Sequence, residues 1–256
     1  MNTGVGPTFW ASWQVAPEIT LALILAEYFY LRQVLKNPSW ATGRERQFFL
    51  AGLVSIALVI VTPFGVHSVD LFWCHMIQHV TLMMISGPLL VLGTPSSFRP
   101  QNKIFTALTH PVASWITYAS LMIGVHLPAP HQFIMNHQWA HTFGEIPLYI
   151  AVPYLFYFNL LDRNLTGRRI SPALSVISLF LMMVPETLTG FFIYVAPHSL
   201  YNEMFTLADQ RRGGSIMWSG GMIIDTVWIA FAVYHWIKSE ERAAIAIDLE
   251  IASKAH

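Results

Sequence analysis

The chain contains a single cysteine, Cys74, among 256 residues. One cysteine excludes an intrachain disulfide framework and any Cys-x-x-Cys metal or redox motif. Charged residues are also scarce, at 11% of the chain, and the formal net charge is zero. Without a basic surface to neutralise phosphates, no nucleic-acid partner is expected. The N-terminus does not resemble a cleavable signal peptide, because the first basic residue, Arg32, follows the first apolar run instead of preceding it.

Apolar residues are abundant, at 54% of the chain, and the mean hydropathy is +0.49. A helix of about 20 apolar residues crosses the hydrocarbon core of a bilayer. Seven segments have this character and leave no room for a separate soluble domain. We therefore predict an all-α polytopic membrane protein whose residues 1–256 form a single seven-helix transmembrane domain. The predicted spans are 17–35, 46–64, 71–93, 110–127, 139–160, 171–195 and 214–237.

Lysine and arginine predict the orientation of these spans. Only two of the fourteen basic residues, Arg211 and Arg212, fall on one side, and the positive-inside rule assigns the other side to the cytoplasm. The N-terminus is then outside and the C-terminus inside. The twelve cytoplasmic residues are Arg32, Lys36, Arg44, Arg46, Arg99, Lys103, Arg163, Arg168, Arg169, Lys238, Arg242 and Lys254.

Two His-x-x-x-His pairs, His75/His79 and His137/His141, lie at the outer mouths of predicted spans. Residues four apart share one face of a helix, so each pair can present two imidazoles to one metal ion. His126 ends the fourth span at a similar depth. Histidine is costly at membrane depth, and imidazole binds copper, zinc and iron. We predict that these five histidines bind one or two metal ions; the alternative is that they form hydrogen bonds between helices.

Five further residues are predicted to support the site or the approach to it: Asp70, Met76, Glu145, Asp209 and Met217. Glu145 continues the face of His141 and is a ligand, a hydrogen-bond acceptor, a proton carrier or simply a protonated carboxyl group. Asp70 either guides a cation or is a solvated loop residue, and Asp209 either completes the metal site or caps a helix. Thioether groups such as that of Met76 favour Cu(I).

Other polar residues are weaker signals. Glu186 and Asp225 lie within the sixth and seventh spans. Each is either a structural hydrogen-bonding group or a proton-handling group. His131 and His198 are expected to be solvated loop residues. For Cys74, which points away from the face of His75, packing is favoured over ligation.

Known enzyme motifs do not fit the histidine pairs. Their second positions hold Met76 and Gln138, so the His-Glu-x-x-His motif of zinc proteases is absent. The histidine boxes of membrane desaturases face the cytoplasm, whereas these pairs face outward. Three alternatives to a metal-binding factor remain. They are a haem-binding electron-transfer protein ligated by His75 and His141, a metal-dependent membrane enzyme that uses Glu145 or Glu186, and a scaffold without metal.

Three sequence blocks carry a family resemblance. The first is His75-Met76-x-Gln78-His79, through Met83-Met84, to Pro88-Leu89-Leu90 and Gly93-x-Pro95. The second is His126-x-Pro128 followed by His137-x-x-x-His141, and the third is Asp209-Gln210 through Gly213-Gly214 to Met217-Trp218. In this order, over residues 70–238, they resemble the CtaG-type, multi-span cytochrome c oxidase assembly factors. Two departures are Ala140, where the family has a carboxylate, and Ser86-Gly87-Pro88, which replaces a more proline-rich stretch.

The resemblance implies a non-enzymatic role in assembling a haem–copper oxidase. The implied cofactor is copper, as Cu(I) or Cu(II), with one or two ions per chain. The implied partners are the catalytic subunit of cytochrome c oxidase and an extracytoplasmic copper donor. The implied location is the lipid bilayer of the bacterial plasma membrane, crossed several times.

Overall fold

A computed structural model describes residues 6, 8–95, 97–98, 102–161, 170–201 and 204–254. All regular structure in these ranges is helical, which confirms the predicted all-α class. Four of the basic residues used to predict the orientation, Arg99, Arg163, Arg168 and Arg169, lie outside the described residues.

The α-helices differ in length and are joined by short connections. They are α1 (Pro17–Lys36), α2 (Gly43–Val61), α3 (Pro63–Val66), α4 (Phe72–Thr81), α5 (Gly87–Leu92), α6 (Lys103–Leu108), α7 (Pro111–His126), α8 (Pro128–Asn136), α9 (Gln138–Ala140), α10 (Ile146–Leu161), α11 (Pro172–Val195), α12 (Leu207–Ser215) and α13 (Gly221–Lys254). Three π-helical turns join neighbouring helices without a break: Leu82–Ser86 between α4 and α5, His141–Glu145 between α9 and α10, and Ile216–Gly220 between α12 and α13.

Local sequence signals explain where the helices begin. Proline occupies the first turn of α1, α7, α8 and α11, where its missing N–H costs no hydrogen bond. Thr42 and Glu45 form a reciprocal capping box at the start of α2. Thr206 caps α12 by accepting a hydrogen bond from the backbone N–H of Asp209.

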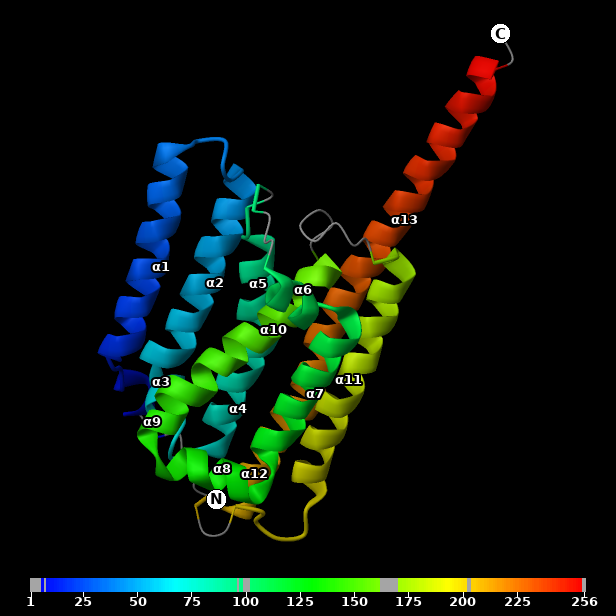
Figure 1. Cartoon of the computed structure of the whole chain (residues 1–256). Helices are drawn as coiled ribbons and strands as arrows, with labels where there is room; N and C mark the ends of the chain where they lie inside the picture. Colours follow the sequence, from blue (N-terminus) through cyan, green and yellow to red (C-terminus); the bar gives the residue numbers. More distant parts are fainter. Residues whose placement is uncertain are drawn as a thin grey trace.

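The helices form an elongated bundle (Figure 1). α5 packs against α2 and α10, α4 packs against α2 and α12, and α11 packs against α7, α12 and α13. The connection between α1 and α2 lies at one end of the bundle, and α8, α9 and α12 lie at the other (Figure 1). The C-terminal part of α13 extends beyond the bundle at the first end (Figure 1).

Within the described parts of the chain, three helical stretches are long and apolar enough to cross a membrane: Phe72–Leu92, Pro172–Val195 and Leu207–Lys254. α7 and α8 together form a fourth such stretch, bent by 74° at Leu127. Many large apolar side chains on the helices are exposed, as expected for surfaces that contact lipid. The chain is therefore a multi-pass helical membrane protein.

Glycines bring α11 and α12 into close contact. A Cβ atom on Gly190 would lie 2.6 Å from the Trp218 backbone nitrogen, and one on Gly214 would lie 2.7 Å from that of Tyr194. A Cβ atom on Gly213 would collide with the Phe72 ring and the Met76 side chain. Small residues at these positions hold α12 against α4 and fix the position of the residues that α12 carries.

Candidate metal centre

The first wall of the site is α4, which carries His75 and His79 in its first two turns. Both side chains are buried, and their ring centroids are 4.0 Å apart. The start of this helix is held by a residue distant in sequence. Asp209 Oδ2 accepts a hydrogen bond from the Phe72 backbone N–H at 2.7 Å, and Oδ1 accepts one from that of Trp73 at 3.3 Å. Asp209 is thus a helix cap, although the helix it caps is α4 and not its own.

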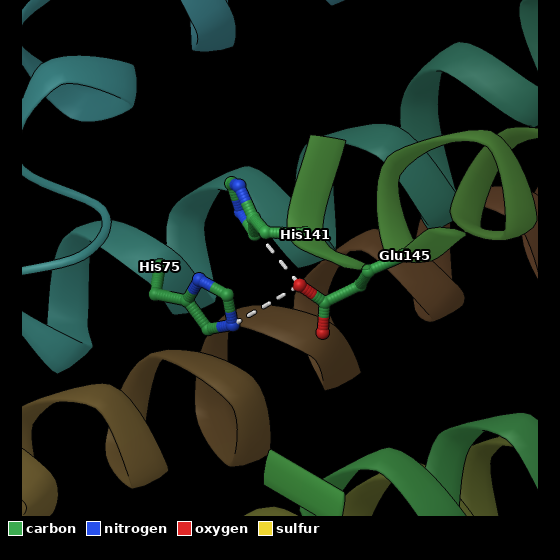
Figure 2. Close-up of side chains that lie close together, drawn as sticks. All are labelled: His75, His141 and Glu145. Atoms are coloured by element: carbon green, nitrogen blue, oxygen red, sulfur yellow. Dashed lines mark ion pairs between the residues drawn. The ribbon is translucent and has the colours of Figure 1, made fainter. Parts of the chain in front are cut away.

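The second wall is the π-helical turn His141–Glu145. Its wider turn places His141 and Glu145 on one face, and both side chains are buried. Glu145 Oε2 lies 3.7 Å from His75 Nε2 and 3.7 Å from His141 Nε2. Figure 2 shows both imidazoles directed at this same oxygen. The other oxygen, Oε1, lies 3.3 Å from His79 Nε2, so one carboxylate faces three histidines.

The third wall is formed by α7 and α8. His126 Nε2 lies 3.4 Å from His79 Nδ1, while its Nδ1 lies 2.5 Å from the carbonyl oxygen of Met122. A carbonyl oxygen only accepts hydrogen bonds, so Nδ1 carries the proton and Nε2 is left as an acceptor or metal ligand. A backbone carbonyl bonded to the distal nitrogen is the usual support of a metal-binding histidine.

His131 is the residue that the sequence reasoning placed wrongly. Instead of being solvated in a loop, it is 0% exposed within α8, and its ring centroid lies 5.2 Å from that of His75. The physical reason is that α8 begins at Pro128, directly after α7, and the 74° bend turns its inner face toward α4. The Pro128-x-Pro130 sequence was the available signal, since proline favours the first turn of a helix.

His137 is not brought to the other histidines. Its side chain is exposed, and its Nδ1 lies 2.8 Å from the carbonyl oxygen of Phe133. α9 begins at Gln138, so His137 precedes the helix, with extended backbone angles (φ −129°, ψ 96°). The four-residue spacing to His141 therefore does not place the two rings on one helical face.

The remaining predicted residues lie around the site in different settings. Met76 and Met217 are buried, and Asp70 is exposed in the loop before α4. His198 is exposed, as expected. Cys74 is a buried free thiol.

Gln78 is a polar neighbour of the site that the sequence reasoning did not single out. Its Oε1 lies 3.1 Å from His141 Nε2, and its amide donates to the carbonyl oxygen of Val59 at 3.3 Å. Since the second bond fixes the amide orientation, Gln78 presents its oxygen to His141, and Nε2 of that ring donates the hydrogen bond. A metal ion at Nε2 would take the place of this proton.

We use the name histidine cluster for His75, His79, His126, His131, His141 and Glu145. Seven buried atoms of this cluster have no hydrogen-bond partner among the described residues: His75 Nδ1 and Nε2, His79 Nε2, His131 Nδ1 and Nε2, and Glu145 Oε1 and Oε2. A buried polar atom left without a partner costs about 1–3 kcal/mol. Four of these atoms, namely His75 Nε2, His79 Nε2 and both Glu145 oxygens, instead pair with one another at 3.7 and 3.3 Å, in an arrangement that could hold a metal ion.

The donor set fits a metal ion. One ligand atom each from His75, His141 and Glu145 lie within 4.8 Å of one another. Two imidazole ligands of a tetrahedral ion, at metal–nitrogen distances of about 2.0–2.1 Å, are about 3.3 Å apart. The observed separations of 3.3 and 3.7 Å around Glu145 are close to this value. Small side-chain rotations would therefore bring these atoms into a coordination shell.

Deeper in the bundle, Glu186 of α11 is buried next to Asp225 of α13. The hydroxyl of Tyr118 donates a hydrogen bond to Glu186 Oε1 at 2.5 Å. Glu186 thus has a structural partner, but its second oxygen has none among the described residues.

Fold and site together define a multi-pass helical membrane protein with a buried group of histidines and a carboxylate that could hold a metal ion. The family model described as cytochrome c oxidase caa3 assembly factor (Caa3_CtaG) matches residues 25–239. The chain belongs to this family, which confirms the resemblance drawn from the three sequence blocks.

Curated relatives of the chain come from mycobacteria. It is 24% identical over 254 residues to Uncharacterized protein ML1998 of Mycobacterium leprae, covering 86% of this chain and 38% of the relative. It is 24% identical over 248 residues to Uncharacterized protein Mb0105 of Mycobacterium bovis, covering 83% of this chain and 37% of the relative. The chain thus spans less than two fifths of the length of these relatives. No solved structure matches the chain.

Proposed function

We propose that the protein binds copper in the histidine cluster and helps to deliver it to the catalytic subunit of a cytochrome c oxidase. The observation that carries this proposal is the buried Glu145 carboxylate, whose oxygens lie 3.3–3.7 Å from the Nε2 atoms of His75, His79 and His141. Membership of an oxidase assembly family supplies the destination of the metal. The role is that of an assembly factor and not of an enzyme.

The proposed ligands are Glu145 and the three histidines whose Nε2 atoms lie 3.3–3.7 Å from its oxygens, His75, His79 and His141. His126 and His131 extend the cluster on the side of α7 and α8. More histidines than one tetrahedral ion requires would allow a stepwise exchange of ligands during transfer, or a second ion. Imidazole and carboxylate donors suit Cu(II) as well as Cu(I).

We further propose that seven helical segments cross the membrane as one domain. α1 and α2 have 20 and 19 residues, long enough to span a bilayer, and α9, its π-helical turn and α10 run without interruption from 138 to 161. The charged residues of α1 and α2 near the helix ends can reach the headgroups. The basic connection between α1 and α2 would be cytoplasmic, so the opposite end of the bundle, with α8 and α9, would face outward.

In this topology a copper donor would approach from the extracytoplasmic side. His137 and Asp70 are exposed near the outward end, and we assign them to the approach path and not to the buried centre. Binding of haem between His75 and His141 is not favoured, because their ring centroids are 5.5 Å apart and Glu145 occupies the space between them.

The test is metal analysis of the protein purified in detergent after loading with copper. Wild-type protein should hold one or two copper ions per chain and show no haem absorption. His75→Ala, His141→Ala and Glu145→Gln should lose copper, whereas His198→Ala, which changes an exposed histidine, should keep it. Wild-type copper content in all three cluster variants would refute the proposal.

A further inference from the structure

A small cavity of about 10 Å³ lies next to the histidine cluster, on the side of Glu186. Four methionines contribute to its wall, and we call it the methionine pocket. Its lining residues are His79, Val80, Met83, Met84, Met122, His126, Glu186 and Met217.

The four thioethers come from separate parts of the chain. Met83 and Met84 belong to the π-helical turn that follows α4, Met122 belongs to α7, and Met217 belongs to the π-helical turn that precedes α13. All four are at most 4% exposed. Methionine often fills irregular gaps in a core, and here four methionines border one gap of about 10 Å³ together with histidine and glutamate side chains.

Buried polar side chains complete the wall. Glu186 is 2% exposed, accepts a hydrogen bond from the Tyr118 hydroxyl and lies next to Asp225. His79 is also buried, and its Nε2 lies 3.3 Å from Glu145 Oε1. A carboxylate in an apolar part of a membrane protein is costly unless a positive charge or a proton accompanies it.

We propose that the methionine pocket is a second metal site, selective for one Cu(I) ion. Thioether sulfur is a soft ligand that favours Cu(I) over Zn(II) and other harder divalent ions. The cavity has the size of about one water molecule, so an ion must enter without its hydration shell.

The two centres share a wall. His79 faces Glu145 in the histidine cluster and also lines the methionine pocket, as does His126. A Cu(I) ion could therefore exchange imidazole for thioether ligands without returning to water. The pocket assignment rests on its own lining residues and does not require the histidine cluster to bind copper.

The experiment is an anaerobic titration of the detergent-purified chain with Cu(I) in competition with a chromogenic chelator, followed by X-ray absorption at the copper edge. Wild-type protein should show copper–sulfur scattering. Met122→Leu and Met217→Leu should each lower this scattering, and the double variant should lower it further. Each should bind Cu(I) at least about 10–100-fold more weakly, since loss of even an outer partner of a metal ligand has that effect. Leucine keeps the side-chain volume approximately constant. Met182→Leu is the matched control, because Met182 is 1% exposed but does not line the pocket.

The outcomes separate this proposal from the preceding one. Glu145→Gln should lose divalent copper and retain the sulfur-bound Cu(I), whereas the methionine variants should behave in the opposite way. Wild-type protein without copper–sulfur scattering would overturn the methionine pocket regardless of how any variant folds. Unchanged Cu(I) affinity in the double methionine variant would overturn it as well.

Discussion

Asp209 offers a sharp test of how the candidate metal centre is held together. Its carboxylate accepts hydrogen bonds from the backbone N–H groups of Phe72 and Trp73, at 2.7 and 3.3 Å. Phe72 and Trp73 are the first two residues of α4, the helix that carries His75 and His79. Removing the carboxylate should therefore weaken the start of the helix and, through it, the position of both histidines.

The expected magnitude follows from these two bonds. In Asp209→Ala, the N–H groups of Phe72 and Trp73 lose their acceptor, at about 1–3 kcal/mol for each buried group. The bond at 3.3 Å is the weaker one, so we expect a total loss of stability of about 2–4 kcal/mol. Asp209→Asn keeps one acceptor oxygen and loses the charge at the positive end of the helix, and it should cost about 0.5–2 kcal/mol.

The assay combines thermal unfolding in detergent with a metal titration. If Asp209 is a cap, Asp209→Asn should melt slightly below wild type and keep its metal, and Asp209→Ala should melt well below it. If Asp209 were a ligand, both variants would lose the metal to a similar extent. The cap interpretation is refuted if Asp209→Ala unfolds at the wild-type temperature or if Asp209→Asn abolishes metal binding without a change in stability.

Three further predictions follow from individual contacts. Glu145→Gln removes the charge that faces three histidines and should weaken metal binding at the histidine cluster by at least about 10–100-fold in a competition titration; an unchanged affinity would contradict its role as a ligand. Gly213→Ala, whose Cβ would meet the Phe72 ring, should destabilise the protein by about 1–3 kcal/mol. Gly124→Ala, which enters open space in α7, should leave stability unchanged or raise it by up to about 1 kcal/mol, and equal melting of the two alanine variants would contradict the packing argument. Tyr118→Phe removes the donor to Glu186 and should destabilise by about 1–3 kcal/mol in the same melting assay; an unchanged melting temperature would contradict a stabilising role for this hydrogen bond.

The sequence was a reliable guide wherever one continuous helix fixed the geometry. His75 and His79 lie within α4, so their four-residue spacing placed both rings on one buried face. The same rule holds for His141 and Glu145, although a π-helical turn and not an α-helical one joins them. Membrane character was equally accessible, since it depends on composition and on the length of apolar runs.

The sequence was a poor guide where a helix boundary fell inside a motif. His137 and His141 have the same spacing as His75 and His79, but α9 begins one residue after His137. The His137 ring therefore lies near the Phe133 carbonyl oxygen and not beside His141. His131 shows the reverse error, because a helix begins before it and buries a ring that was expected in a solvated loop. Helix boundaries within one or two residues are set by tertiary contacts and are the least accessible feature of a sequence.

Contacts between residues distant in sequence determine the geometry of the candidate metal centre. The sequence therefore identified several of its residues but not how they lie relative to one another. Asp209 holds α4 from 137 residues away along the chain, and the Glu145 carboxylate meets His75 across a separation of 70 positions in the sequence. Each of these residues alone has a structural explanation, as a cap, a packed ring or a protonated acid. What makes a metal site possible is their convergence around Glu145, whose oxygens lie 3.3–3.7 Å from His75, His79 and His141. Since a bundle that needed only to be stable would gain by replacing such buried polar groups with apolar ones, their grouping favours a function for these residues over packing alone.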